Sequence, residues 1–134
     1  DRLRSRGLGD VYKRQEKGSL YEMYQIADIG VIPSLFEPFG YVAVEMMMYA
    51  LPLITTATSG VDEVVDDTCG FKVPLIKTNK KVEIDPLLLA EKIVYLLQHS
   101  DVAYEMGQNG RKRYLAKYSS EIFRQNMVQL YSSL

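Results

Sequence analysis

Short apolar runs alternate with amphipathic stretches along the chain from about Leu20 onward. Three runs combine β-branched side chains with glycine or proline at their ends, which predicts short buried strands. These predicted strands cover residues 29–33, 52–56 and 70–74. Helical periodicity predicts helices over 20–27, 40–50, 61–66, 85–99, 101–118 and 119–133, with a polar loop over 75–84. Because strands that alternate with helices are typical of a parallel sheet, the fold class is α/β with flanking helices.

Several helix starts have capping residues. Asp85 precedes Pro86, a pair that favours an N-cap followed by the first helical position. Ser59, Asp101 and either Ser119 or Ser120 are the predicted caps of three other helices. The inner face of the helix over 85–99 is predicted to contain Leu87, Ala90, Ile93, Val94 and Leu97.

Composition narrows the function classes. The chain has 134 residues, a 47% hydrophobic content, 25% charged residues and a net charge of −1, so no global field would recruit nucleic acid. The single cysteine, Cys69, excludes an internal disulfide and favours a reducing compartment, and we expect a cytoplasmic protein. Only one histidine, His99, is present and no Asp-x-Asp motif occurs, so we expect no metal cofactor.

The first fifteen residues differ from the rest of the chain. Residues 1–15 are rich in arginine and glycine and have no apolar period. The stretch from Asp10 to Gln15 resembles the translated end of a sequencing adapter, although a natural linker would show the same lack of pattern. We therefore interpret 1–15 as a non-native or linker segment and 19–134 as the folded domain. Three strands make only half of a Rossmann-like sheet, so we expect a partial domain whose other strands lie upstream.

Two glutamates stand out in the run from Ser34 to Met48. Glu45 follows Glu37 by eight positions, and the residues between Val42 and Leu51 are otherwise apolar or tyrosine. This composition predicts a buried helix, in which a carboxylate is costly unless something pairs with it. No Lys, Arg or His lies within one helical turn of Glu45, so its partner is either distant in sequence or a ligand. The local pattern favours a ligand.

A predicted strand, a glycine-bearing turn and a helix start follow one another here. Gly40 has no Cβ, so a phosphate or sugar can approach its backbone closely. The free N–H groups at a helix start and the helix dipole both favour an anion. The sequence therefore predicts a site for a polyhydroxylated anion, with phosphate at the helix start and hydroxyls at the two carboxylates.

At these residues the chain resembles a known family. The run Glu37-Pro-Phe-Gly through Glu45 is similar to the E-x7-E motif of retaining glycosyltransferases of the GT-B fold, particularly family 4. The resemblance extends from about Ser19 to Leu134 and includes Ala27-Asp28, Pro33-Ser34, residues 50–56, Ser59-Gly60 with Glu63, and residues 70–74. The segments 81–98 and 107–114 resemble a branch found in surface-polysaccharide gene clusters of Bacteroides-like bacteria.

The resemblance implies a partial C-terminal, nucleotide-sugar-binding domain and a role for each site residue. It implies that Glu37 is catalytic and contacts the transferred sugar, and that Glu45 accepts hydrogen bonds from the ribose hydroxyls. It implies further that the backbone amides of four residues hold the donor: Phe39, Gly40, Tyr41 and Val42. Ser34 and Gly60 are additional donor-binding candidates, although a turn residue and a helix start would explain them as well. Phe36 and the Phe39 ring are interpreted as packing residues.

The resemblance also implies the partners. They are a nucleotide-sugar donor and a saccharide or lipid-linked acceptor, the latter bound by an N-terminal domain, and the full enzyme would associate peripherally with a membrane. The last helix would pack against that domain, and we expect the chain alone to be inactive. Two other functions stay open: a nucleotide-sugar epimerase of similar architecture, and a non-catalytic nucleotide-binding module.

Overall fold

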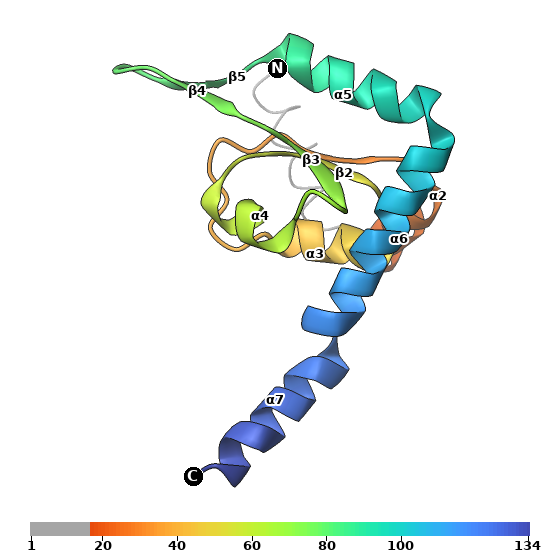
Figure 1. The fold of residues 1–134 in the computed structure, drawn as a ribbon, viewed down its shortest axis with the longest axis vertical. Coiled ribbons are helices and arrows are strands. Elements are labelled where there is room, and N and C mark those ends of the chain that lie inside the picture. Colours follow the sequence, from red (N-terminus) through yellow and green to blue (C-terminus); the bar gives the residue numbers. More distant parts are fainter. Residues whose placement is uncertain (1–16) are drawn as a thin grey trace, which may run out of the picture.

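The computed structural model describes residues 17–134, and its centre is a three-stranded parallel sheet (Figure 1). The strands are β1 (Gly30–Ile32), β2 (Leu53–Thr56) and β3 (Gly70–Val73), in the order β1-β2-β3. Gly30 pairs with Leu53, which in turn pairs with Gly70, so all three strands begin at one edge of the sheet. The α/β parallel fold is confirmed, and the three predicted strands differ from the observed ones by at most one residue at each end. The segment 1–15 lies outside the described residues.

Helices cover both faces of the sheet. The crossover helices α3 (Tyr41–Met48) and α4 (Ser59–Val64) lie on one face, and α5 (Pro86–Gln98) lies on the other (Figure 1). The alternation of side chains along β2 explains the two cores, since neighbouring residues point to opposite faces. Leu53 belongs to the core beneath α3 and α4, and Ile54 belongs to the core beneath α5.

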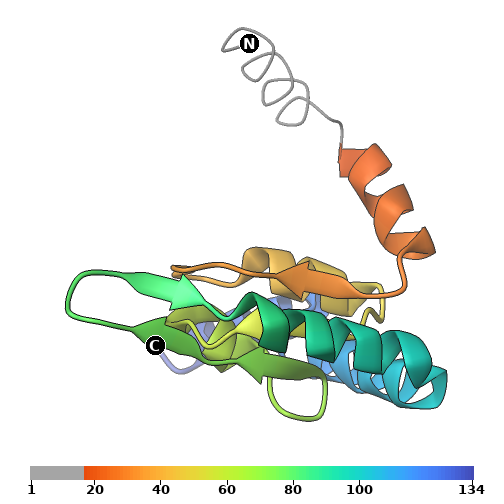
Figure 2. The same cartoon turned by 90° about the horizontal axis from the view of Figure 1, so that it is seen from above.

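Two more helices complete the body of the molecule. The long helix α6 (Ser100–Lys117) crosses from the α5 side to the α3 side, and contributes Met106 to one core and Tyr114 to the margin of the other. The first described helix, α2 (Lys17–Ile26), contributes the buried ring of Tyr24 to the core near α3. Figure 2 shows α5 and α6 alongside each other and the α2 ribbon leading into β1.

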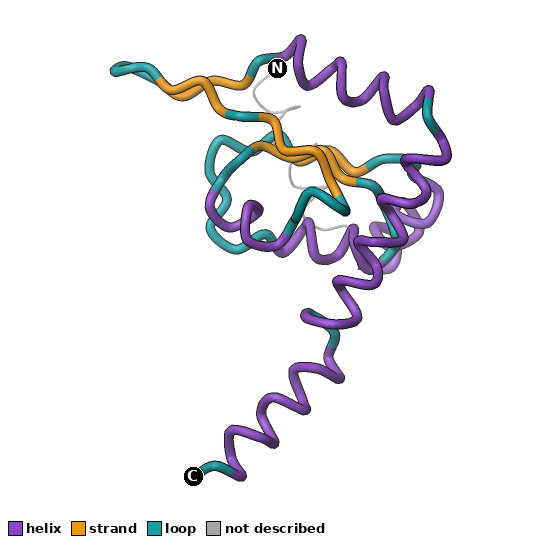
Figure 3. The backbone as a smooth tube through the Cα atoms, in the orientation of Figure 1, coloured by secondary structure: helices purple, strands orange, loops and turns teal. Residues whose placement is uncertain are grey.

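The last helix, α7 (Ser120–Ser132), extends away from the sheet, as the tube in Figure 3 shows. No residue of α7 is buried, and Phe123 and Tyr131 are among its exposed large side chains. Ser119 caps this helix, because its hydroxyl accepts a hydrogen bond from the Ile122 amide at 3.3 Å. The prediction of Ser119 as one of two possible caps is thus confirmed.

The polar loop predicted over 75–84 is an antiparallel hairpin. Its strands are β4 (Leu75–Lys77) and β5 (Val82–Ile84), and it projects beyond the end of β3 (Figure 1). The turn between them closes through the Thr78 amide, which donates to the Lys81 carbonyl at 2.9 Å. Each strand has only three residues and the turn contains no glycine, so both of the usual hairpin indications are missing from the sequence.

The predicted helix caps have mixed outcomes. Asp85 is confirmed, since its carboxylate accepts from the Leu87 and Leu88 amides at 3.0 and 3.2 Å. The predictions for Ser59 and Asp101 are wrong, because the helices begin one or two residues earlier and those side chains lie in the first turn.

The predicted inner face of α5 is also wrong in part. Leu87 is 80% exposed and Leu97 is 60% exposed, whereas Leu96 is buried. The residues of α5 that join Leu96 against the sheet are Leu88, Leu89 and Ile93. The helix is apolar on more than one side, so its periodicity alone did not select the face that packs.

Candidate functional site

The predicted site loop lies at the carboxyl edge of the sheet, between the end of β1 and the start of α3. The Glu37 carboxylate folds back over this loop. Its Oε1 atom accepts hydrogen bonds from the Phe39 and Gly40 amides, each at 3.2 Å. Gly40 has φ +72°, a left-handed conformation that favours glycine, and it leads directly into α3. Glu37 therefore supplies the negative charge at this helix start.

Gly60 supports the loop from beneath. Its amide donates to the Glu37 carbonyl at 2.9 Å. A Cβ at Gly60 would lie 2.4 Å from the Glu37 carbonyl oxygen and 2.5 Å from the Phe39 amide nitrogen, so only glycine permits this approach. The buried Gly60 therefore fixes the loop backbone, and its amide is engaged by the protein rather than open to a ligand.

The four amides predicted to hold the donor fall into two pairs. Those of Phe39 and Gly40 are occupied by Glu37. Those of Tyr41 and Val42 are the first two of α3, where no intrahelical acceptor exists. An incoming anion would therefore meet the Tyr41 and Val42 amides directly, and would compete with the Glu37 carboxylate for the other two.

The prediction that Glu45 is stranded in a wholly buried helix is wrong. Only Ala43 and Met47 of α3 are buried, while Glu45 is half-buried and Tyr41 is 68% exposed. The Glu45 Oε2 atom accepts a hydrogen bond from the Tyr24 hydroxyl at 3.3 Å. The helix lies on one face of the sheet with Ala43 and Met47 toward the core, and its opposite side, which includes Tyr41 and Val42, is exposed. The argument that Glu45 needs a ligand to satisfy it therefore fails, and its second oxygen is the one left for a ligand.

Threonines at the end of β2 were missed by the sequence analysis. The Thr56 hydroxyl donates to the Ser34 carbonyl and ties the ends of β1 and β2 together. Within the described residues, the hydroxyls of Thr55 and Thr58 are buried and have no hydrogen-bond partner. Thr58 lies directly before α4 at the same edge as Gly60. Since threonine is common in strands, composition gives no indication of this arrangement.

The aromatic side chains of the loop are exposed. Phe36 is 77% exposed and Phe39 is 63% exposed, so the interpretation of these two as packing residues is wrong. The Phe39 ring stacks on the Tyr41 ring, with centroids 5.4 Å apart and an interplanar angle of 19°. Tyr41 is the first residue of α3, so this stacked pair lies at the start of the helix.

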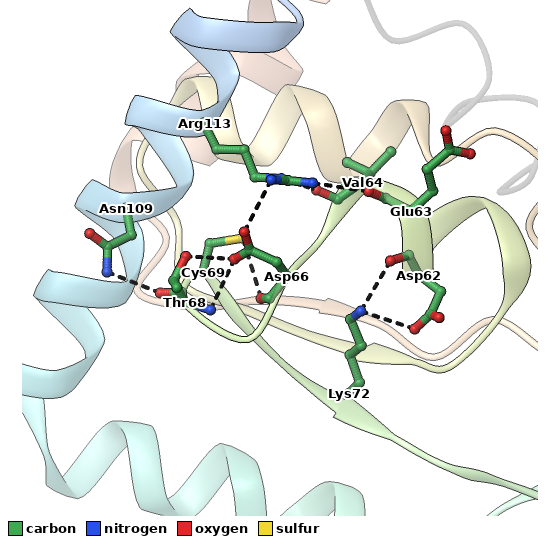
Figure 4. A network of polar contacts seen from close by, with 9 residues as sticks. All are labelled: Asp62, Glu63, Val64, Asp66, Thr68, Cys69, Lys72, Asn109 and Arg113. Carbon is green, nitrogen blue, oxygen red and sulfur yellow. Dashed lines mark hydrogen bonds and ion pairs between the residues drawn. The ribbon is translucent and has the colours of Figure 1, made fainter.

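Polar side chains at the opposite end of α4 are paired with one another (Figure 4). Arg113 of α6 donates to the Glu63 and Val64 carbonyls at 3.1 and 2.7 Å and pairs with Asp66 at 3.0 Å. The pKa of Asp66 is lowered, first by the hydrogen bond from the Thr68 hydroxyl. Arg113 thus caps the carbonyl end of α4.

Two concavities of about 430 Å³ each occur elsewhere on the surface. One is bordered by Asp28, Pro52 and Ser100, and the other by Thr68, Phe71 and Asn109, near the starts of the strands. Neither includes a predicted site residue. In the part of the chain that the structure describes, no helix combines the length and apolarity needed to cross a membrane.

The match to a protein family agrees with this geometry. The family model described as "Glycosyl transferases group 1" matches residues 10–113, which contain β1 to β3, both glutamates and Gly60. The chain belongs to the group 1 glycosyl transferases. This membership supports the coarser part of the resemblance, a GT-B C-terminal domain of a transferase.

Relatives of this glycosyl transferase chain are named for different activities. It is 32% identical over 111 residues to the capsular polysaccharide biosynthesis glycosyltransferase CapM of Staphylococcus aureus, covering 82% of this chain and 27% of CapM. The sucrose-phosphate synthase structure from Thermosynechococcus elongatus superposes with a TM-score of 0.77 at 31% identity, over 98% of this chain and 34% of that one. HepE of Anabaena, solved in complex with UDP-glucose, shares the fold with a TM-score of 0.69 at 21% identity, over 84% and 29%. The chain spans about a quarter of the length of the curated relatives it matches.

Proposed function

We propose that the chain forms the donor-binding part of a retaining, family 4 glycosyltransferase that moves a sugar from a nucleotide-diphosphate donor to a hydroxyl acceptor. The observation that carries the proposal is the start of α3. There Glu37 already occupies two backbone amides as an internal anion, and the Tyr41 and Val42 amides have no intrahelical acceptor. HepE, a protein of the same fold, binds UDP-glucose, which supports a nucleotide-sugar partner.

The proposed roles follow from the chemistry of each group. The distal phosphate of the donor lies at the Tyr41 and Val42 amides, where the helix dipole also favours negative charge. As the bond between the sugar and the phosphate breaks, charge grows on that oxygen, and fixed N–H groups stabilise the transition state more than the ground state. The Glu45 oxygen that Tyr24 leaves free accepts a ribose hydroxyl.

Glu37 takes two successive roles in this proposal. Without donor, it satisfies the Phe39 and Gly40 amides, so the loop keeps its shape. When the nucleotide-sugar donor binds, oxygen atoms of the donor replace the Glu37 carboxylate at the Phe39 and Gly40 amides. The released carboxylate then contacts the hydroxyls of the transferred sugar, close to the positive charge that develops at the anomeric carbon. Ser34, which lies next to this loop, borders the same space.

The acceptor belongs to the part of the enzyme that the chain does not include. CapM is named for capsular polysaccharide biosynthesis, and we propose a saccharide or lipid-linked acceptor of the surface-polysaccharide type for this protein as well. We also propose a metal-independent reaction and a cytoplasmic location. Peripheral contact with a membrane would follow if the acceptor is lipid-linked, because such an acceptor lies at a membrane surface.

Glu37→Gln in the full-length protein tests the proposal. Binding of UDP-glucose, GDP-mannose and ADP-glucose is measured by calorimetry, and transfer is followed by NMR of the product anomer. We expect one donor to bind, and E37Q to retain its nucleotide affinity while turnover falls at least about a hundredfold, the scale of lost transition-state stabilisation. The exposed Glu22→Gln is the matched control and should change neither quantity.

Three results would contradict parts of this proposal. An epimerised donor without transfer would indicate an epimerase, and binding without any turnover of the wild-type protein would indicate a binding module. A product of inverted anomeric configuration would exclude the retaining mechanism. If none of the three donors binds, the proposed function is wrong.

A further inference from the structure

Tyr24 connects α2, the helix before the sheet, to α3, the helix that carries Glu45, the residue proposed to bind the ribose. It lies on α2, is 7% exposed, and its hydroxyl donates to Glu45 Oε2 at 3.3 Å. The two residues are 21 positions apart, on different helices. Within the described residues, this is the only side-chain hydrogen bond that α2 makes to α3.

The ring of Tyr24 is held in place by two other tyrosines. Its centroid lies 5.7 Å from that of Tyr49 and 6.3 Å from that of Tyr21. Tyr49 is the C-cap residue of α3 and follows Glu45 by four positions, so it lies on the Glu45 side of the helix end. Tyr24 therefore packs on Tyr49 and reaches along that face to the Glu45 carboxylate. Such packing removes rotamer freedom from the Tyr24 side chain before any ligand arrives.

The Tyr24 hydroxyl is a permanent hydrogen-bond donor. Burial, together with the negative charge of Glu45 and the hydrogen bond to it, raises the pKa of Tyr24 to about 12. The hydroxyl therefore keeps its proton across the physiological range. Because a carboxylate can only accept hydrogen bonds, the orientation of the contact is fixed: Tyr24 donates and Glu45 accepts.

We infer that Tyr24 is a positioning residue, which holds one oxygen of Glu45 so that the other is presented to a hydroxyl of the nucleotide donor. This inference rests on the proposed function. A carboxylate on a free side chain loses rotamer entropy when it binds a ligand, and a carboxylate already held at Oε2 has lost part of it beforehand. Tyr24 thus contributes to donor affinity without touching the donor.

The test is a double-mutant cycle on donor affinity in the full-length protein. The variants are Y24F, E45Q and the double variant, and the probe is whichever of UDP-glucose, GDP-mannose and ADP-glucose binds the wild type. We expect Y24F to weaken binding about three- to tenfold, the scale of one hydrogen bond. In the E45Q background, Y24F should weaken binding by less than about twofold, because an amide that accepts from Tyr24 through its single oxygen presents an NH2 group, not an acceptor, to the donor.

The control is Tyr21→Phe, which removes a hydroxyl from the same ring cluster. Within residues 17–134 the Tyr21 hydroxyl makes no side-chain hydrogen bond, so Y21F should leave donor affinity unchanged. Steady-state rates separate positioning from general damage. For Y24F we expect a higher KM for the donor, an unchanged KM for the acceptor and an unchanged kcat, whereas a loosened fold would lower kcat as well.

A second measurement does not require Y24F to fold. Tyrosine ring carbons labelled with ¹³C report the titration of Tyr24 by NMR, and E45Q should lower its midpoint because the facing charge is removed. An unchanged midpoint would overturn the inference. The inference would also be overturned if Y24F bound the donor with normal affinity while E45Q bound it more weakly. That result would leave the proposed function intact. Normal donor affinity in E45Q would instead remove the proposed role of Glu45, and the inference with it.

Discussion

The two ends of α4 are held by different kinds of contact. At the start of the helix, the backbone of Gly60 holds the backbone of the site loop. Gly60 packs beneath the loop, and its amide donates a hydrogen bond to the Glu37 carbonyl. The aromatic side chains above that loop are largely exposed. At the end of the helix, side chains hold the structure, since Arg113 binds two carbonyls and pairs with Asp66.

The difference indicates which end is available for a ligand. Side chains that stabilise the fold through their own polar groups, as Arg113 does, have little capacity left for binding. The loop supported by Gly60 leaves the Tyr41 and Val42 amides without an intrahelical acceptor and its rings exposed. Preorganised backbone of this kind can bind a ligand at low entropic cost. We therefore expect variants at the start of α4 to impair donor binding, and variants at its end to change stability alone.

The largest effect is expected from Gly60→Ala. The new methyl group would lie 2.4 Å from backbone atoms of Glu37 and Pro38, so the loop or the helix must move. We expect a loss of about 3 kcal/mol in the free energy of unfolding, the upper end of overpacking penalties, together with loss of donor binding. Urea unfolding measures the first and calorimetry the second. The control is Gly18→Ala, where among the described residues no atom outside the local helix backbone lies within 4 Å of the new methyl group, and stability should not fall. Unchanged stability in G60A would disprove the tight backbone contact.

Arg113→Ala tests the other end of the helix. The substitution removes hydrogen bonds to Glu63 and Val64 and leaves the Asp66 carboxylate without its cation. We expect a loss of about 2 kcal/mol in the free energy of unfolding, and an unchanged donor affinity for the folded protein. Arg124→Ala is the matched control, since its ion pair with Glu121 is exposed to solvent and its loss should leave the free energy of unfolding nearly unchanged. Weaker donor binding in R113A would show that the two ends are not independent.

Alkaline unfolding tests the hydrogen bond between Tyr24 and Glu45. This contact combines features of both ends of α4, because a fold-stabilising side chain contacts a candidate site residue. The pKa of Tyr24 is raised from 10.0 to about 12 in the folded protein. The unfolded chain therefore releases this proton first, and stability should fall as the pH rises from about 10 to about 12. We expect Tyr24 to account for about 1–2 kcal/mol of that fall. Urea unfolding at several pH values should show a shallower decline in Y24F than in Y21F, and equal slopes would contradict the prediction.

The smallest effect on stability is expected from Phe39→Ala. The ring is 63% exposed and its main contact is the stacking on Tyr41, so we expect a change below about 0.5 kcal/mol. Thermal unfolding measures it, and Phe71→Ala at the β3–α5 core is the contrasting variant, with an expected loss of at least about 2 kcal/mol. A large loss of stability in F39A would mean that the rings at this edge serve the fold.

The order of the elements and the place of the candidate loop were predictable from the sequence. Periods of two and 3.6 residues are set by backbone geometry, so the strands and most of the helices follow from local pattern. Asp85 with Pro86 marked the start of α5 for the same reason, since a cap acts within three residues. Gly40 was singled out for its missing Cβ, and its φ of +72° adds a second reason for glycine at this position that the sequence analysis did not predict.

Only the tertiary structure decided which groups meet. The sequence of α5 is apolar on more than one side, so it did not reveal which face packs against the sheet. The hydrogen-bond partner of Glu45, Tyr24, lies on another helix. Two other contacts are also non-local. Gly60 bonds to Glu37, 23 positions away, and Arg113 bonds to Glu63, 50 positions away. The physical reason is that periodicity and capping act over a few residues, whereas the atoms that satisfy a carboxylate or a carbonyl are chosen by how the layers pack.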